Sequence, residues 1–475
     1  MAGLVPAIHE LKLRASGIWK MDGRHEGGHD EDERANGPAF FYKTSRSVGF
    51  RFAALIEGPS VTEATSQTYG SRTALIFIFV TMLVDSIGLG VIIPVAPKII
   101  SQLTGEDMSG AARWGGWLFF VFALMQFLCA PLIGNLSDRF GRRPILIASI
   151  LMLGFDYFIT GIAPTIFWLF VSRFLSGIAG ASYTTAYAYI ADITPPEKRA
   201  ANFGITGAAF SVGFILGPVI GGLLGATDPR LPFFVAAGLS VLNGLFGFFI
   251  LKESLAPENR RKFEFWRANP VGALVALKRF PGIYLFCIVL ILMRLAHDAN
   301  PAVFSYYVMF KFHWTPQLVG YALMTVGALM GVVYGILVRI VIPKIGEAAS
   351  VYVGLSGAAI GFAGYAFATE SWEMFACMVP FALIGFFQPA LNAIMSKMVG
   401  PKEQGELQGA LACVGSLTSI VAPPLLTNLF AYFSSGNAPV YFPGAAFLAG
   451  SLCLVLAALV FSRIRAESPA LQPAE

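Results

Sequence analysis

The sequence predicts an all-α polytopic membrane protein, with twelve transmembrane helices in two pseudo-symmetric six-helix bundles. Three observations support this fold class. Charged residues make up only 13% of the 475 residues, against about 25% in a soluble domain. Apolar stretches of about twenty residues follow one another along the chain. Loops rich in Lys and Arg alternate with loops that are poor in them.

The apolar stretches predict helices rather than barrel strands. Backbone groups inside lipid must be hydrogen-bonded within the protein, which leaves helices or closed barrels. Barrel strands alternate apolar and polar residues, whereas runs such as 145–163 are apolar without alternation. The first six spans are expected at 73–100, 114–134, 144–163, 165–190, 202–225 and 232–251. The second six are expected at 282–309, 317–341, 348–368, 372–395, 407–433 and 441–462.

Basic residues gather in every second loop, and the positive-inside rule places those loops and both termini in the cytoplasm. The expected location is the inner (plasma) membrane. The predicted parts are a polar tail that we expect to be disordered, two bundles joined by a basic linker, and a second tail. Their ranges are 1–70, 71–251, 252–281, 282–463 and 464–475. The first range is either a cytoplasmic tail or an over-long translated start.

Composition also excludes several kinds of function. The net charge of +5 is modest and no basic face is clustered, so no nucleic-acid partner is predicted. The five cysteines lie in apolar runs without metal-ligand spacing, so no metal site, disulfide framework or cofactor is expected. The sequence contains neither a nucleophile–base constellation nor a phosphate-binding loop, so no enzyme is predicted. The expected partners are a small-molecule substrate, protons and the lipid bilayer, and the chain is expected to act as a monomer.

The loop between spans 2 and 3 carries the most specific motif, Gly-Asn-Leu-Ser-Asp-Arg-Phe-Gly-Arg-Arg, at residues 134–143. It resembles the signature of the major facilitator superfamily. One carboxylate beside three guanidiniums can form a network in one conformation and break it in another, and so latch the cytoplasmic side. The alternative is that the arginines only fix topology. The residues concerned are Gly134, Asp138, Arg139, Gly141, Arg142 and Arg143.

Span 5 contains small residues and a proline that let helices approach closely and bend. As chemistry alone this is a packing face. As a pattern it resembles the motif of proton-driven exporters in the superfamily. The residues are Gly213, Gly217, Pro218, Gly221 and Gly222.

Further segments, including 85–97, 137–144 and 188–194, are similar to those of the tetracycline/proton antiporters. This resemblance runs from about residue 73 to 463. It implies exchange of a cationic or metal-chelated drug for an inward proton. It also implies that Asp85 is the essential acid of the first helix. The family carries a histidine in helix 8 and an aspartate in helix 9, where this chain has Met330 and Ala358, and Pro343 replaces an aspartate in the second loop copy.

Ionisable residues inside spans are costly and are functional by default. Asp85 stands alone in span 1, and burial favours a protonated carboxyl that can carry a proton. Asp156 and Arg173 are expected to meet across adjacent helices, either as a structural pair or as proton-handling groups. In span 7, Arg294, His297 and Asp298 share one region of the helix, as a proton relay or as a structural salt bridge.

Polar and aromatic residues within the spans are the candidate substrate contacts, because central aromatic rings suit a flat amphipathic ligand. They are Gln126, Tyr183, Tyr187, Tyr306, Gln388 and Asn392. The sequence thus predicts a proton-coupled antiporter that exports small amphipathic compounds, with tetracycline-like drugs among the candidates. Two alternatives are an importer or facilitator of sugars or organic solutes, and a non-transporting receptor or scaffold.

Overall fold

The computed structural model describes residues 61–181, 183–263, 282–400, 403–436 and 438–467. Within these ranges every regular element is a helix, and twelve helical segments are long and apolar enough to cross a membrane. The predicted all-α, twelve-span fold is therefore confirmed. The predicted tail segments 1–60 and 468–475 and the linker segment 264–281 lie outside the described residues.

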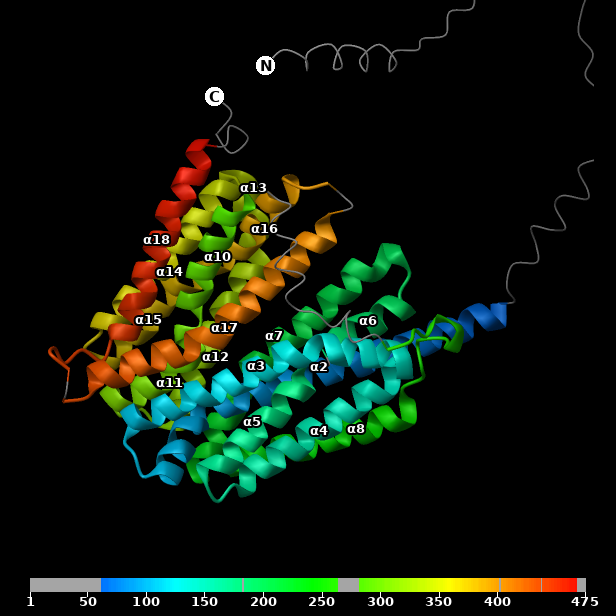
Figure 1. Ribbon diagram of the computed structural model, residues 1–475, viewed down its shortest axis with the longest axis horizontal. Helices are drawn as coiled ribbons and strands as arrows, with labels where there is room; N and C mark the ends of the chain where they lie inside the picture. The colour runs from blue at the N-terminus through cyan, green and yellow to red at the C-terminus, as the bar shows by residue number, and fades with distance from the viewer. Residues whose placement is uncertain (1–60, 182, 264–281, 401–402, 437, 468–475) are drawn as a thin grey trace, which may run out of the picture. The chain divides into compact units, whose positions relative to one another are not determined.

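The first six spans are built from seven helices (Figure 1). The first helix begins at Val61, ten residues before the predicted boundary at residue 71, so the helix extends beyond the apolar segment. The helices are α2 (Val61–Thr104), α3 (Met108–Phe140), α4 (Arg142–Ile162), α5 (Ile166–Gly180), α6 (Tyr183–Ile193), α7 (Pro196–Thr227) and α8 (Leu231–Ile250). The helices α5 and α6 together form span 4.

The second six spans contain more interruptions. Span 7 is α10 (Ile283–His297) with α11 (Ala299–Phe312). Span 8 is α12 (Pro316–Val332), a π-helical turn η5 (Val333–Leu337) and α13 (Val338–Ile345). Span 9 is α14 (Glu347–Phe367). Span 10 is α15 (Ser371–Ala382), a 3-10 turn η6 (Leu383–Phe386) and α16 (Phe387–Lys397), and spans 11 and 12 are α17 (Gln404–Ser434) and α18 (Ala445–Glu467).

The break in span 7 follows from its sequence. Pro301 has no backbone N–H, and its ring clashes with the carbonyl of the residue four positions earlier, His297. The helix α10 ends at that residue, and Asp298 caps both α10 and α11. The break thus places an aspartate, and its side chain, at a helix junction inside the span.

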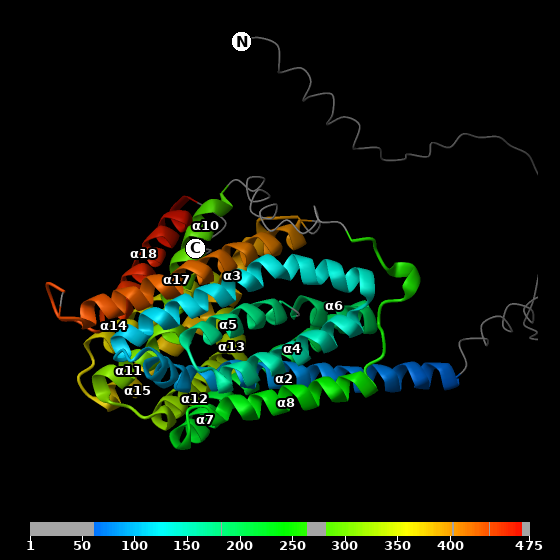
Figure 2. The same ribbon diagram turned by 60° about the horizontal axis from the view of Figure 1, so that its bottom comes forward.

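Helices from the two halves lie side by side at two places. The helix α7 packs against α2 of its own half and α12 of the other half, and α3 packs against α17 and α11. Figures 1 and 2 show the pairing of α3 (cyan) with α17 (orange) from two directions. We call the membrane face that carries the α3–α4 turn the motif side, and the other face the opposite side.

The halves touch closely at the opposite side. A Cβ atom added at Gly222 in α7 would lie 2.6 Å from the carbonyl oxygen of Pro316 in α12. One added at Gly116 in α3 would lie 3.0 Å from Cα of Pro424 in α17. Ser109 Oγ, near the start of α3, donates a hydrogen bond of 3.2 Å to the carbonyl of Ala431 in α17. Backbones of the two halves are therefore in contact on this side.

The motif side is different. A Cβ atom added at any of several glycines near the motif-side ends of α7, α12 and α17 or in the turn η5 after α12 would meet no described atom within 4 Å. These helices are the ones that join the halves on the opposite side. The structure is therefore closed on the opposite side, and it is open on the motif side, where a cavity of about 650 Å³ is lined by residues of both halves. The glycines are Gly204, Gly207, Gly331, Gly335, Gly405 and Gly409.

Candidate functional site

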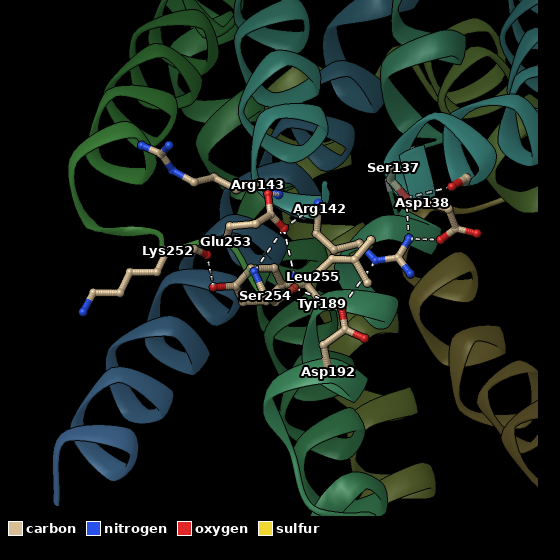
Figure 3. A network of polar contacts seen from close by, with 11 residues as sticks. Ser137, Asp138, Arg142, Arg143, Tyr189, Asp192, Lys252, Glu253, Ser254 and Leu255 are labelled. Atoms are coloured by element: carbon tan, nitrogen blue, oxygen red, sulfur yellow. Dashed lines mark hydrogen bonds and ion pairs between the residues drawn. The ribbon is translucent and has the colours of Figure 1, made fainter. Parts of the chain in front are cut away.

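The loop motif forms a polar network centred on Arg142 (Figure 3). Its Nη1 atom donates a 2.6 Å hydrogen bond to Ser137 Oγ and lies 2.5 Å from Asp138 Oδ1. Its Nε atom lies 3.4 Å from Oδ2 of Asp192 at the end of α6. Asp192 also accepts a 3.0 Å hydrogen bond from Ser254 Oγ, beyond the end of α8. One guanidinium therefore joins three parts of the first half.

The carboxylate of Glu253 completes the network. It accepts hydrogen bonds from the backbone N–H groups of Arg142 and Arg143, at 2.8 and 3.3 Å. These groups begin α4, and an acidic side chain at a helix N-terminus is favourable. Gly141 precedes them with φ of +105°, and a Cβ atom there would collide with the Glu253 carboxylate. Only glycine fits the turn that brings the chain round to this acid.

The other arginines of the motif contact nearby aromatic rings and carbonyls. Arg143 Nη2 donates to the carbonyl of Phe248 at 2.6 Å, and its guanidinium lies over that ring. Arg139 lies over the ring of Phe140, 5.0 Å from the centroid. In this open arrangement the motif side chains described above contact the first half, and Glu253 and the Arg261 amide, which donates to the Asp138 carbonyl at 3.1 Å, join them from the start of the linker. The latch across the halves stays a prediction for another conformation.

The glycines of α7 lie on two faces of the helix. Three of them, Gly213, Gly217 and Gly221, lie against α2, and Gly213 and Gly217 would each place a Cβ atom 2.6 Å from a carbonyl oxygen of that helix. Gly222 instead meets α12, and Pro218 lies between the two helices, with its ring against Gly90 of α2 and its carbonyl against Gly320 of α12. The carbonyls that the first three glycines face are one turn apart, at Leu83, Ile87 and Val91.

Three cavities follow one another through the molecule. A wide cavity of about 650 Å³ lies towards the motif side. An apolar cavity of about 190 Å³ lies towards the opposite side. Between them a charged cavity of about 20 Å³ shares Gly180 and Tyr183 with the wide cavity, and shares Phe122 and Arg173 with the apolar one. The charged cavity has room for about one water molecule.

Asp85 lines the charged cavity and is 4% exposed. Its Oδ1 atom has no hydrogen-bond partner among the described residues. The rings of Tyr157 and Tyr183 line the same cavity, and the hydroxyl of Tyr183 also has no described partner. The predicted lone carboxylate of span 1 is therefore buried beside an internal space that can admit water.

The predicted meeting of Asp156 and Arg173 also occurs. Asp156 Oδ2 lies 3.3 Å from Arg173 Nη2, and Ser172 Oγ donates a 2.5 Å hydrogen bond to the other carboxylate oxygen. Thr160 Oγ1 lies 2.6 Å from Ser172 Oγ and extends the set of polar contacts. Asp156 itself is 0% exposed. Both members of the pair line the charged cavity with Asp85.

In the second half, the salt bridge between Arg294 and Asp298, which was one of the two alternatives for this cluster, is absent from the described residues. Asp298 Oδ2 instead accepts a 2.9 Å hydrogen bond from Ser419 Oγ of α17, and Oδ1 lies 3.8 Å from His297 Nδ1. Arg294 lines the wide cavity.

The predicted substrate contacts divide into two groups. Gln126 and Tyr183 line the wide cavity, and Tyr306 lines the apolar one. The remaining three lie outside these cavities. Tyr187 stacks edge-on against Phe203, and Gln388 donates to Asn392 at 2.9 Å.

The two positions where the family's ionisable groups are missing are occupied by packing residues. Met330 packs against the cluster formed by Val333, Ala382 and Phe386. Ala358 in α14 is 0% exposed and belongs to the main buried cluster, which contains residues of both halves. Within the described part of the chain, no three His, Cys, Asp or Glu side chains come together as a metal site.

Two residues that bond to the predicted site residues were not predicted from the sequence. Glu253 follows Lys252 in the linker and is separated from the loop motif by more than a hundred residues, so no local pattern links them. Ser419 lies in an apolar span, where serine usually bonds to its own helix. The signal for Asp192 was available, since it ends span 4 on the same membrane face as the motif.

Residues 74–423 match the sequence profile of the Major Facilitator Superfamily. The chain is 38% identical to the class C tetracycline resistance protein of Escherichia coli, over 79% of this chain and 94% of that relative. It is 31% identical to multidrug resistance protein 2 of Bacillus subtilis (strain 168), over 76% of this chain and 89% of the relative.

Solved structures are similar in fold. A bacterial homologue of the human lysosomal transporter Spinster, in an inward-facing and unoccupied conformation, has a TM-score of 0.67 and 17% identity. The match covers 84% of this chain and 99% of that structure.

Proposed function

The chain belongs to the major facilitator superfamily and is a transporter, and on this premise we propose that it exports small amphipathic compounds in exchange for protons. The relatives named for resistance to tetracyclines and to multiple drugs support export as the direction. Tetracycline-like drugs are therefore candidate substrates. The transporter acts as a monomer in the plasma membrane.

The observation that carries the coupling proposal is the buried, unpartnered Asp85 beside the charged cavity. A carboxylate in a low-dielectric site prefers its neutral form unless a positive charge compensates it. Asp85 can therefore take up a proton when the cavity opens to one side and release it when it opens to the other. Asp156 is compensated by Arg173, so Asp85 is the proton carrier and the pair holds α4 and α5 together.

The basic loops support a cytoplasmic motif side. In that orientation the structure is inward-facing, with the wide cavity accessible to compounds in the cytoplasm. Substrate then enters among Gln126, Tyr183 and Arg294. Closure of the motif side and separation of the Gly222–Pro316 contact would transfer it outwards.

The test is substrate uptake into everted membrane vesicles driven by an imposed proton gradient. We expect Asp85→Asn to abolish uphill uptake while the protein stays in the membrane. The matched control is Asp228→Asn, an exposed aspartate that accepts a hydrogen bond from the Arg230 amide, and it should transport normally. Undiminished uphill uptake by Asp85→Asn would refute the coupling role.

The direction of transport separates an exporter from an importer. Everted vesicles accumulate the substrate of an exporter, whereas right-side-out vesicles accumulate that of an importer. The glycine pattern of α7 resembles that of proton-driven exporters and therefore supports the exporter. These glycines contact both α2 and α12.

A further inference from the structure

We propose that Arg294 binds an ionised acidic group of the transported compound, so that the substrates are amphipathic anions or zwitterions. This inference rests on the proposed function and specifies the substrate class of the same transporter. It differs from the cationic or chelated drug that family resemblance implies.

The first support is that Arg294 has no counter-ion among the described residues. No described acidic side chain pairs with it, and its buried Nε atom has no hydrogen-bond partner. The nearest acid along its helix, Asp298, is directed towards Ser419 and His297. Guanidinium groups stay charged, and an uncompensated charge within a membrane span is costly. A ligand that supplies the missing negative charge would therefore be stabilised here.

The second support is access. Arg294 lines the wide cavity, which lies between the halves on the motif side. Gly415 of α17 lies opposite the guanidinium, and a Cβ atom there would be 3.7 Å from Arg294 Nε. The absence of a side chain at Gly415 leaves one flank of the guanidinium uncovered. A planar carboxylate or enolate can approach it from the cavity.

The third support is the character of the remaining lining. Among the described residues that line the wide cavity, Arg294 is the one ionisable group other than a tyrosine and a cysteine. Gln126 and Tyr183 provide hydrogen-bonding groups, and Phe127 and Leu411 provide apolar surface. The described residues of this lining include no carboxylate, so the cavity complements an apolar body that carries a negative group.

The experiment measures binding to the purified full-length protein in lipid nanodiscs. The probes are a matched pair of flat aromatic compounds, 2-naphthoate and 2-naphthamide, which differ in charge but little in shape. We expect the acid to bind at least about tenfold more tightly than the amide, as for a charge-assisted hydrogen bond. Arg294→Gln should remove this difference, and Arg294→Lys should retain part of it.

The control is Arg339→Gln in α13, an exposed arginine outside the cavity lining, which should bind both probes as the unaltered protein does. The proposal is overturned by equal affinity for the two probes, by an acid affinity that survives Arg294→Gln, or by no binding of either. These outcomes leave uphill, Asp85-dependent uptake intact. Loss of that uptake in everted vesicles would instead refute the proposed function.

Discussion

Asp156 of α4 and Arg173 of α5 form an ion pair within the membrane, with 3.3 Å between Oδ2 and Nη2. The two helices are consecutive, antiparallel and in contact, so each side chain reaches the other at a similar depth. The carboxylate is fully buried and is also hydrogen-bonded to Ser172. Buried pairs of this kind stabilise a structure only while both partners remain.

Neutralising one partner should therefore be more damaging than neutralising both. Asp156→Asn or Arg173→Gln alone leaves one buried charge uncompensated, and we expect each to cost about 3–5 kcal/mol of stability. The double variant should recover a large part of this loss. The measurement is thermal unfolding of purified protein in nanodiscs. Additive losses in the double variant would show that the two side chains do not act as a pair.

The close contact of α7 with α12 predicts sensitivity to a single methyl group. Gly222→Ala would place a Cβ atom 2.6 Å from the Pro316 carbonyl oxygen, and we expect about 1–3 kcal/mol of destabilisation from overpacking. The comparison is Gly238→Ala in α8, an exposed position where an added Cβ atom meets nothing within 4 Å. That variant should be at least as stable as the unaltered protein. Equal unfolding temperatures for the two variants would contradict the contact.

Glu253 should matter for the first turn of α4. Glu253→Ala removes the acceptor of the Arg142 and Arg143 amides and a favourable charge at a helix N-terminus, which is worth about 0.3–1 kcal/mol. Hydrogen exchange at these amides should become faster. The nearby Glu258→Ala, at an exposed position after α8, should leave their exchange unchanged. Equally slow exchange of these amides in both variants would contradict the hydrogen bonds to Glu253.

The opening towards the motif side predicts which positions water can reach. A cysteine at Gly409, which lines the wide cavity, should react with a membrane-impermeant thiol reagent in everted vesicles and not in right-side-out ones. A cysteine at Gly436, in the loop after α17 on the opposite side, should show the reverse pattern. Both are placed in a variant without the five native cysteines. Identical labelling of the two in one vesicle type would refute this arrangement.

Much of the fold could be predicted because each span is identified from its own apolar length and from the basic residues of the loops beside it. The number of spans depends on runs such as 145–163, which must be helical in lipid whatever surrounds them. The interruptions within the spans were harder to predict. Pro301 is present in the sequence, but a proline can bend a helix without ending it. The hydrogen bond between Asp298 at the junction and Ser419 is a tertiary contact that no local pattern predicts.

The site was predicted where its members are close in sequence or lie on consecutive helices. Asp138 and Arg142 are four residues apart and form an ion pair, and Asp156 and Arg173 meet across one hairpin. Arg294 is the informative exception. Its spacing from Asp298 was compatible with a salt bridge or a proton relay, and the hydroxyl of Ser419 that bonds Asp298 comes from α17, more than a hundred residues away.

The closed side of the transporter has a consequence for the energy of its working cycle. Its contacts include a close backbone approach at Gly222 and Pro316 and a hydrogen bond from the Ser109 hydroxyl to the Ala431 carbonyl. Two functional conformations of one protein typically differ by only a few kcal/mol. One proton crossing the membrane potential contributes about 2.3 kcal/mol per 100 mV. An energy of that size is then large enough to drive the halves apart on one side and together on the other.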